Sequence, residues 1–223
     1  MISSSTTLSQ DHTTREDWAQ LKKYAAENKK LKPPGKKEQR IVFMGNSITE
    51  FWKSDRPFFS STYINRGISG QTTAQMLMRF KQDVITLKPY VVVILGGIND
   101  IAQNQGHVTL EQTFNNISAM AALAKKNNIK VILSSVLPAE DFYWKPGLQP
   151  ALKIKKLNAM IKSYCLRNKL YYVNYYSAMV DQRGGLQKIY SEDGVHPNIR
   201  GYKVMEPLVQ KAIKATIGSE PTR

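Results

Sequence analysis

Residues 40 to 49 read Arg40-Ile41-Val42-Phe43-Met44-Gly45-Asn46-Ser47-Ile48-Thr49. Four apolar residues, β-branched at the start, run into a glycine, as in a parallel strand that is buried on both faces and ends in a sharp turn. Ser47 follows the carboxyl end of this strand, where ligands and chemistry collect in open α/β sheets. A serine hydroxyl becomes an effective nucleophile only when a base removes its proton and donors receive the developing negative charge. A reactive Ser47 would therefore need a base, an orienting acid and an oxyanion hole from the rest of the chain.

Apolar segments that read as strands alternate with helical patterns along the chain. Further strands are predicted over residues 62–65, 90–95, 130–133 and 170–173. Between them, apolar residues recur at spacings of three and four, which is the pattern of amphipathic helices. Such alternation implies right-handed βαβ crossovers. It predicts an α/β fold of three layers, α/β/α, with a flavodoxin-like sheet of five parallel strands and helices on both faces.

Several helix boundaries are marked by residue type. Two pairs have the spacing of a capping box and predict helix starts: Thr72 with Gln75, and Thr109 with Gln112. Pro89 is expected to end the first of these helices. A C-terminal helix is expected from about Gly201, and Pro207 should kink it or mark a restart.

The chain is expected to form one domain preceded by a disordered lead. Residues 1–13 are rich in serine and threonine and lack the basic start and apolar core of a signal peptide. Residues 14–218 are assigned to a single domain, with residues 14–30 as an N-terminal helix packed on it, since apolar residues recur at helical spacing from Trp18. The compartment stays open: periplasmic or secreted if a native signal has been removed, and cytoplasmic otherwise. No oligomeric state is indicated.

Composition excludes some classes of protein. No apolar run approaches the roughly 20 residues of a membrane span, and the single cysteine, Cys165, excludes an internal disulfide and is expected to be a buried thiol.

The net charge of +15 could favour acidic polysaccharide, anionic lipid or nucleic acid. The basic residues are nevertheless spread from Lys22 to Lys214 without a nucleic-acid motif, so a solubilising coat and no nucleic-acid partner are expected.

Only three histidines could serve as a base, and one of them has an acid nearby. His12 lies in the lead and His107 in a loop without acidic neighbours, whereas His196 follows Asp193 by three residues. In a tight loop such a carboxylate can fix the imidazole tautomer and stabilise its charged form. A loop aspartate and histidine without a role remain the alternative. The histidines are too few and scattered for a metal site, and serine chemistry requires no cofactor, so neither is expected.

At this point the sequence resembles the SGNH, or GDSL, family of esterases and lipases. The resemblance runs in order through four blocks: Gly45-Asn46-Ser47-Ile48, Asn65-Arg66-Gly67-Ile68-Ser69-Gly70, Gly97-Ile98-Asn99-Asp100 and Asp193-Gly194-Val195-His196-Pro197. Asn46 departs from the pattern, because many members have aspartate before the serine. The α/β-hydrolase alternative fits poorly, since the chain has no Gly-x-Ser-x-Gly elbow.

The resemblance implies a role for each matched residue. Ser47 would be the nucleophile, His196 the general base and acid, and Asp193 the residue that orients His196. The oxyanion hole would consist of the backbone N–H groups of Ser47 and Gly70 and the side-chain amide of Asn99. These roles agree with the chemistry that a serine nucleophile needs.

The resulting prediction is a serine esterase that hydrolyses short-chain esters through an acyl-enzyme. The favoured substrate is a small-molecule or oligosaccharide ester, above all an O-acetylated carbohydrate. The aromatic side chains of Phe51, Trp52, Tyr143 and Trp144 are candidates for the pocket wall, the last two on a long loop from Pro138 to Pro150. Three alternatives stay open: a lysophospholipase, thioesterase or platelet-activating-factor acetylhydrolase-like lipid esterase; a non-catalytic binding module on the same fold; and a charge-driven nucleic-acid binder.

Overall fold

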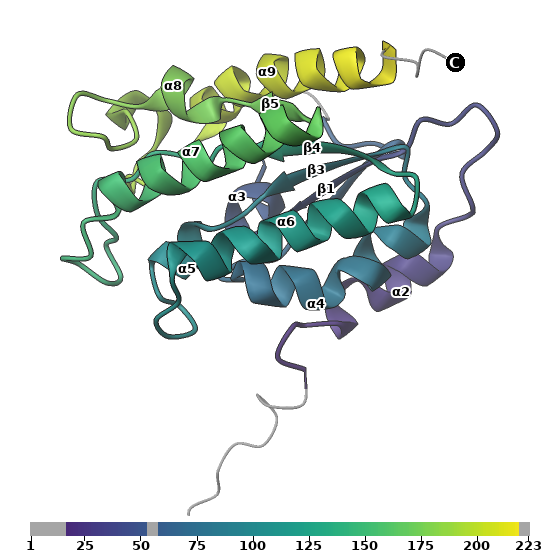
Figure 1. Cartoon of the computed structure of the whole chain (residues 1–223), viewed down its shortest axis with the longest axis horizontal. Coiled ribbons are helices and arrows are strands. Elements are labelled where there is room, and N and C mark those ends of the chain that lie inside the picture. The colour runs from purple at the N-terminus through teal and green to yellow at the C-terminus, as the bar shows by residue number, and fades with distance from the viewer. Residues whose placement is uncertain (1–16, 53–57, 219–223) are drawn as a thin grey trace, which may run out of the picture.

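The computed structural model describes residues 17–52 and 58–218, and these residues build a parallel sheet between two layers of helices (Figure 1). The strands are β1 (Ile41–Gly45), β2 (Tyr63–Gly67), β3 (Val91–Leu95), β4 (Lys130–Ser134) and β5 (Tyr171–Val173). They are all parallel, in the order β2-β1-β3-β4-β5. This is the flavodoxin-like order, and the predicted fold class is confirmed.

Helices cover both faces of the sheet. One face packs against α4 (Thr73–Asp83), α6 (Leu110–Lys126) and α7 (Pro150–Asn168), and the other against α3 (Ser47–Glu50) and α9 (Ile199–Gly218). The remaining helices are α2 (Lys22–Lys30), α5 (Ile98–Ile101) and α8 (Tyr175–Met179), with short 3₁₀ turns η1 (Ile85–Leu87) and η2 (Lys188–Tyr190).

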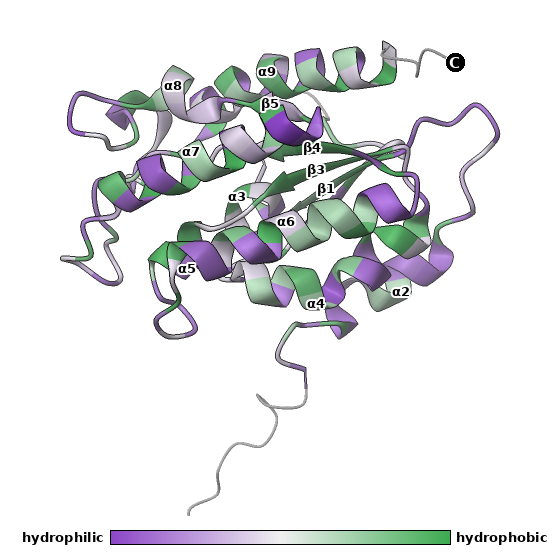
Figure 2. Ribbon diagram, in the orientation of Figure 1, coloured by the Kyte–Doolittle hydropathy of each residue, from purple (hydrophilic) through white to green (hydrophobic). Residues whose placement is uncertain are grey.

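Two interior strands of the sheet, β1 and β3, form the middle of the core. Every residue of β1 and β3 is buried, which explains their continuous apolar sequences. Figure 2 shows these strands as hydrophobic, whereas the covering helices alternate hydrophobic and hydrophilic residues. Within the described residues, no helix is both long enough and apolar enough to cross a membrane.

Both predicted capping boxes are present. The Thr72 N–H donates to Gln75 Oε1 at 3.0 Å at the start of α4. The Thr109 N–H donates to Gln112 Oε1 at 2.8 Å at the start of α6. These bonds depend only on residues three positions apart, which is why the sequence identified them.

One helix ends earlier than predicted, and another continues through a proline that was predicted to kink it or mark a restart. The helix expected to run to Pro89 ends at Asp83 and continues as the 3₁₀ turn η1, after which Lys88 adopts a positive φ of 48°. At the other end of the chain, α9 begins at Ile199 and passes through Pro207 without a restart. Met205 and Val209 on either side of the proline are buried, and this packing offsets the backbone hydrogen bond that proline cannot make.

The N-terminal helix is attached by polar contacts instead of an apolar stripe. It starts at Lys22, and none of its residues is buried. Asn28 Nδ2 donates to Asp83 Oδ1 at 2.7 Å, and Glu27 pairs with the buried Arg66 at 3.0 Å. Figure 1 shows α2 beside α4. The predicted disordered lead, residues 1–13, lies outside the described residues.

Candidate active site

A tight turn after β1 presents Ser47. Asn46 is the N-cap of α3, and its Oδ1 accepts a hydrogen bond from the Ile48 N–H at 3.2 Å. Gly45 is required at the end of the strand, because an added Cβ would lie 2.0 Å from Thr49 Oγ1 and 2.9 Å from the Leu95 carbonyl oxygen. Ser47 therefore becomes the first residue of α3, at the carboxyl edge of the sheet.

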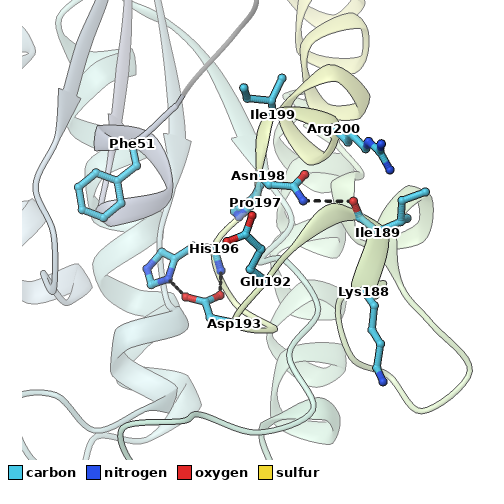
Figure 3. A pocket seen from close by; sticks show the side chains of 10 residues that line it. All are labelled: Phe51, Lys188, Ile189, Glu192, Asp193, His196, Pro197, Asn198, Ile199 and Arg200. Carbon is cyan, nitrogen blue, oxygen red and sulfur yellow. Dashed lines mark hydrogen bonds and ion pairs between the residues drawn. The ribbon is translucent and has the colours of Figure 1, made fainter.

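Three predicted site residues form one hydrogen-bonded line. Ser47 Oγ lies 2.9 Å from His196 Nε2. His196 Nδ1 lies 2.7 Å from Asp193 Oδ2. Figure 3 shows the imidazole turned toward Asp193, with Phe51 on its other side. A neutral imidazole that donates from Nδ1 to the carboxylate presents an unprotonated Nε2 to the serine hydroxyl.

The loop around Asp193 keeps its carboxylate in place and ionised. Oδ1 accepts hydrogen bonds from the N–H groups of His196 at 2.7 Å and Val195 at 2.9 Å, and the Ser191 hydroxyl donates to it at 3.1 Å. Partial burial raises the pKa of Asp193, but these backbone bonds and the bond from the imidazole outweigh it and leave the pKa below its ordinary value.

The predicted oxyanion donors line a cavity with Ser47 and His196. This cavity has a volume of about 650 Å³, and its wall includes Gly70 and Asn99. Gly70 has a positive φ of 74°, which glycine adopts without strain. Asn99 is only 3% exposed, and its Nδ2 donates to the Gln71 carbonyl oxygen at 2.9 Å.

Three of the four candidate aromatic residues, Phe51, Tyr143 and Trp144, border the same cavity. Tyr143 and Trp144 both line it, and Tyr143 is 65% exposed. The Trp144 indole N–H donates to Asn104 Oδ1 at 3.1 Å, and its ring centroid lies 6.4 Å from that of His196. The loop from Pro138 to Pro150 thus brings its aromatic residues to the mouth of the site.

Trp52 was predicted to line the pocket, and its position corrects that prediction. It is 8% exposed and lies in an aromatic cluster, with ring centroids 5.1 Å from Phe58 and 5.2 Å from Tyr202. Its indole N–H donates to Glu206 Oε1 at 3.3 Å. It is not among the residues that line the cavity at Ser47. The physical cause is α9, whose side chains enclose Trp52 from a distant part of the sequence.

A second cavity adjoins the first and was not predicted. It has a volume of about 880 Å³ and shares Phe51 and His196 with the cavity at Ser47 (Figure 3). Its wall includes Phe51, Ile189 and Ile199, which are 45%, 52% and 44% exposed. Three apolar side chains from separate segments gave no joint signal in the sequence.

Other supporting residues were also missed by sequence reasoning. Asp100 is buried, and it accepts hydrogen bonds from the Thr73 N–H at 2.9 Å and the Thr73 hydroxyl at 2.6 Å, which ties the Asn99 turn to α4. Burial raises the pKa of Asp100, against the opposing effect of the Thr73 bonds. His107 is exposed and is not among the residues that line the cavity at Ser47. Across residues 17–52 and 58–218, no group of three or more His, Cys, Asp or Glu side chains is placed to hold a metal ion.

Comparisons with known proteins agree with the fold and with the sequence blocks. A candidate acylhydrolase from Bacteroides fragilis is 50% identical, with a TM-score of 0.88 over 91% of this chain and 99% of that one. A GDSL-like lipase from Bacteroides thetaiotaomicron is also 50% identical, with a TM-score of 0.86 over 89% and 98% of the two chains.

Among curated proteins, the uncharacterized lipoprotein YqeF of Bacillus subtilis is 27% identical over 128 residues. That match spans 56% of this chain but only 44% of the relative's length. The family model of the GDSL-like lipase/acylhydrolases matches residues 43–204, a range that holds all four sequence blocks. The chain therefore belongs to the GDSL-like lipase/acylhydrolase family of ester-bond hydrolases.

Proposed function

We propose that this protein is a serine esterase that removes short acyl groups, above all acetyl, from O-acetylated carbohydrates. The observation that carries the proposal is the line Ser47–His196–Asp193, with contacts of 2.9 Å and 2.7 Å, at a cavity that Gly70 and Asn99 also line. Nucleophile, base, orienting acid and oxyanion donors are the set that acyl transfer requires.

Each residue has a defined part in the proposed reaction. Ser47 Oγ attacks the ester carbonyl while His196 Nε2 takes its proton. The negative oxygen of the tetrahedral intermediate accepts hydrogen bonds from the N–H groups of Ser47 and Gly70 and from Asn99 Nδ2. His196 then gives the proton to the leaving alcohol, and a water molecule activated by the same imidazole hydrolyses the acyl-enzyme.

The preference for a short acyl group rests on the lack of aliphatic side chains at the cavity beside Ser47: among the described residues that line it there is no Leu, Ile, Val or Met, and its apolar surface comes from aromatic rings. Its described lining is rich in polar residues, including Ser69, Gln103, Asn104, Gln105 and Lys145. Each methylene left in water forgoes roughly 0.8 kcal/mol of binding. Exposed Tyr143 and Trp144 give a sugar ring aromatic faces to stack on.

The second cavity supports a second candidate, a lipid esterase. Phe51, Ile189 and Ile199 form an apolar wall beside His196 that could bury an aliphatic chain. A lysophospholipase or a platelet-activating-factor acetylhydrolase-like enzyme would use such a wall. The two candidates differ in which substrates react fastest.

Hydrolysis of p-nitrophenyl esters from acetate to octanoate separates the two candidates. If the protein is a carbohydrate esterase, the acetate ester should react faster than the butyrate ester and far faster than the octanoate ester. The enzyme should then also release acetate from acetylated xylan or pectin fragments. Faster turnover of octanoate, or of a lysophospholipid, would favour the lipid esterase. Binding of either substrate class without any turnover would identify a non-catalytic module.

We also propose a periplasmic or secreted location over a cytoplasmic one. The support is the relative YqeF, which is a lipoprotein. Fractionation of cells that express the native gene, followed by immunoblotting, tests this, and recovery with the cytoplasmic fraction would contradict it.

A further inference from the structure

We propose that Glu50 is a positioning residue for the oxyanion hole, held in place by Lys23 of the N-terminal helix. This inference rests on the proposed function, because it concerns the N–H of Gly70 as an oxyanion donor. It assigns a role in the reaction to residues 17–30, a segment that precedes the range matched by the family model.

Glu50 joins the turn of the nucleophile to the loop of the oxyanion donor. It is the last residue of α3, the helix that begins with Ser47. Its Oε2 accepts two hydrogen bonds from Ser69, one from the backbone N–H and one from the hydroxyl, both at 2.6 Å. Ser69 precedes Gly70 directly, so fixing Ser69 at two atoms fixes the peptide plane that aims the Gly70 N–H.

Packing does not hold Gly70 in place, so hydrogen bonds must. Gly70 is exposed, and a Cβ built on it would meet no atom within 4 Å. Upstream, the Ile68 N–H donates to the Gly45 carbonyl oxygen at 3.1 Å, which ties the loop to β1. Between that contact and the turn at Gln71, Glu50 anchors the loop through its two short bonds to Ser69, whereas Asn104 Nδ2 makes a longer contact of 3.5 Å with the Gly70 carbonyl oxygen, on the far side of Gly70 from its N–H.

Lys23 completes the arrangement from α2. Its Nζ lies 2.7 Å from Glu50 Oε1, so the two carboxylate oxygens of Glu50 have separate partners, Lys23 on one and Ser69 on the other. The Glu50 side chain is only 20% exposed. Partial burial raises its pKa, but the hydrogen bonds from Lys23 and Ser69 outweigh burial and leave the pKa below its ordinary value. The Lys23 ammonium group therefore keeps the largely buried Glu50 carboxylate ionised, and in that form it accepts both hydrogen bonds from Ser69.

The same N-terminal segment also supports the second predicted donor. Asn99 Nδ2 donates to the Gln71 carbonyl oxygen at 2.9 Å, and Gln71 Nε2 donates in turn to the Ala19 carbonyl oxygen at 2.7 Å. Gln71 is 1% exposed. Residues 17–30 thus contact the supports of Gly70 and of Asn99, from outside the sheet that carries Ser47.

The test compares Glu50→Gln and Lys23→Met with two control variants on α2, the helix that carries Lys23. Lys22→Met removes an exposed lysine whose side chain makes no hydrogen bond or ion pair with the described residues. Glu27→Gln weakens the ion pair between α2 and Arg66 and does not affect the Glu50–Ser69 contact. For p-nitrophenyl acetate, Glu50→Gln should lower kcat roughly 10- to 100-fold with little change in KM, since the donor matters most in the transition state. Lys23→Met should lower kcat by a smaller factor, and Lys23→Arg should restore it. Both controls should keep kcat.

Three further readouts decide the interpretation. The double variant Lys23→Met with Glu50→Gln should lose no more activity than Glu50→Gln alone, because both act through one contact. A kcat within twofold of wild type for both Glu50→Gln and Lys23→Met would overturn the proposal. So would a Glu27→Gln variant that loses as much kcat as Lys23→Met while the two variants have the same thermal midpoint. Should Glu50→Gln fail to fold, Lys23→Met and its Arg rescue decide the matter alone. Hydrolysis that survives Ser47→Ala would overturn the proposed function together with this inference, whereas its loss in Ser47→Ala beside an unchanged Glu50→Gln would overturn the inference only.

Discussion

Ser47 Oγ lies 2.9 Å from His196 Nε2, although 149 residues separate the two in the chain. Ser47 begins α3, directly after the interior strand β1, and His196 lies in the loop before α9. The sheet and α9 hold the contact, since Tyr202 on α9 donates to the Ile48 carbonyl oxygen at 2.8 Å. The helix that begins with Ser47 and the helix that follows the His196 loop are therefore hydrogen-bonded directly to each other.

Replacing Ser47 by alanine should abolish esterase activity and leave the fold intact. The hydroxyl is the atom proposed to form the acyl bond, and alanine leaves no nucleophile in its place. A fluorophosphonate probe should label the wild type and not the variant, as followed by gel fluorescence and mass spectrometry. Labelling that persists at another serine of Ser47→Ala would contradict the assignment.

Asn99→Ala should lower kcat by about a hundredfold or more with little change in KM. One hydrogen of the Asn99 amide is engaged by the Gln71 carbonyl oxygen, and no acceptor among the described residues takes the other, which is available to an oxyanion. The substitution also leaves the Gln71 carbonyl oxygen without its donor, which should cost about 1–3 kcal/mol of stability. Steady-state kinetics and a thermal melt separate the two effects. A variant that changed KM alone would make Asn99 a binding residue instead.

Trp144→Ala should raise KM for acetylated sugars more than for p-nitrophenyl acetate. The indole lines the cavity at Ser47 and is 37% exposed, so it can stack on a sugar ring without supporting the core. Kinetics on acetylated xylo-oligosaccharides and on the chromogenic ester measure the difference. Equal effects on both substrates would remove Trp144 from the alcohol site.

Trp52→Ala serves as the control for Trp144→Ala, because it removes a buried tryptophan that does not line the cavity at Ser47. The side chain is 8% exposed and stacks on Phe58 and Tyr202, so its loss should cost about 3–5 kcal/mol of unfolding free energy. Its effect on KM should not depend on whether the alcohol is a sugar. Urea unfolding gives the stability, and a variant as stable as wild type would place Trp52 outside the core.

Acidification should weaken the fold partly through Asp193. Its pKa in the folded protein lies below the ordinary value, so its hydrogen bonds stabilise the fold at pH values above about 3.9. That contribution is lost as the pH falls through the folded pKa, when the carboxylate is protonated. Asp193→Asn should therefore show a smaller fall in urea midpoint between pH 6 and pH 3 than wild type. Parallel curves for the two proteins would show that Asp193 contributes nothing to acid unfolding.

Local features of this protein could be read from its sequence because neighbours along the chain produce them. The apolar run from Ile41 to Met44 gave a buried parallel strand, and threonine–glutamine pairs three apart gave both capping boxes. Asp193 and His196 lie three residues apart, so one tight loop is enough to bring their side chains together.

Features that depend on distant partners were decided by the tertiary structure alone. Trp52 and Trp144 each follow an aromatic residue and precede a lysine in the sequence, yet α9 encloses the first, and the loop after β4 leaves the second at the cavity. Pro207 continues a helix because buried neighbours hold it there. Glu50 meets Ser69 once α3 packs against β2, and it meets Lys23 once α2 packs beside α4. Burial and charge pairing are set by which surfaces meet in space, and a linear pattern does not specify that.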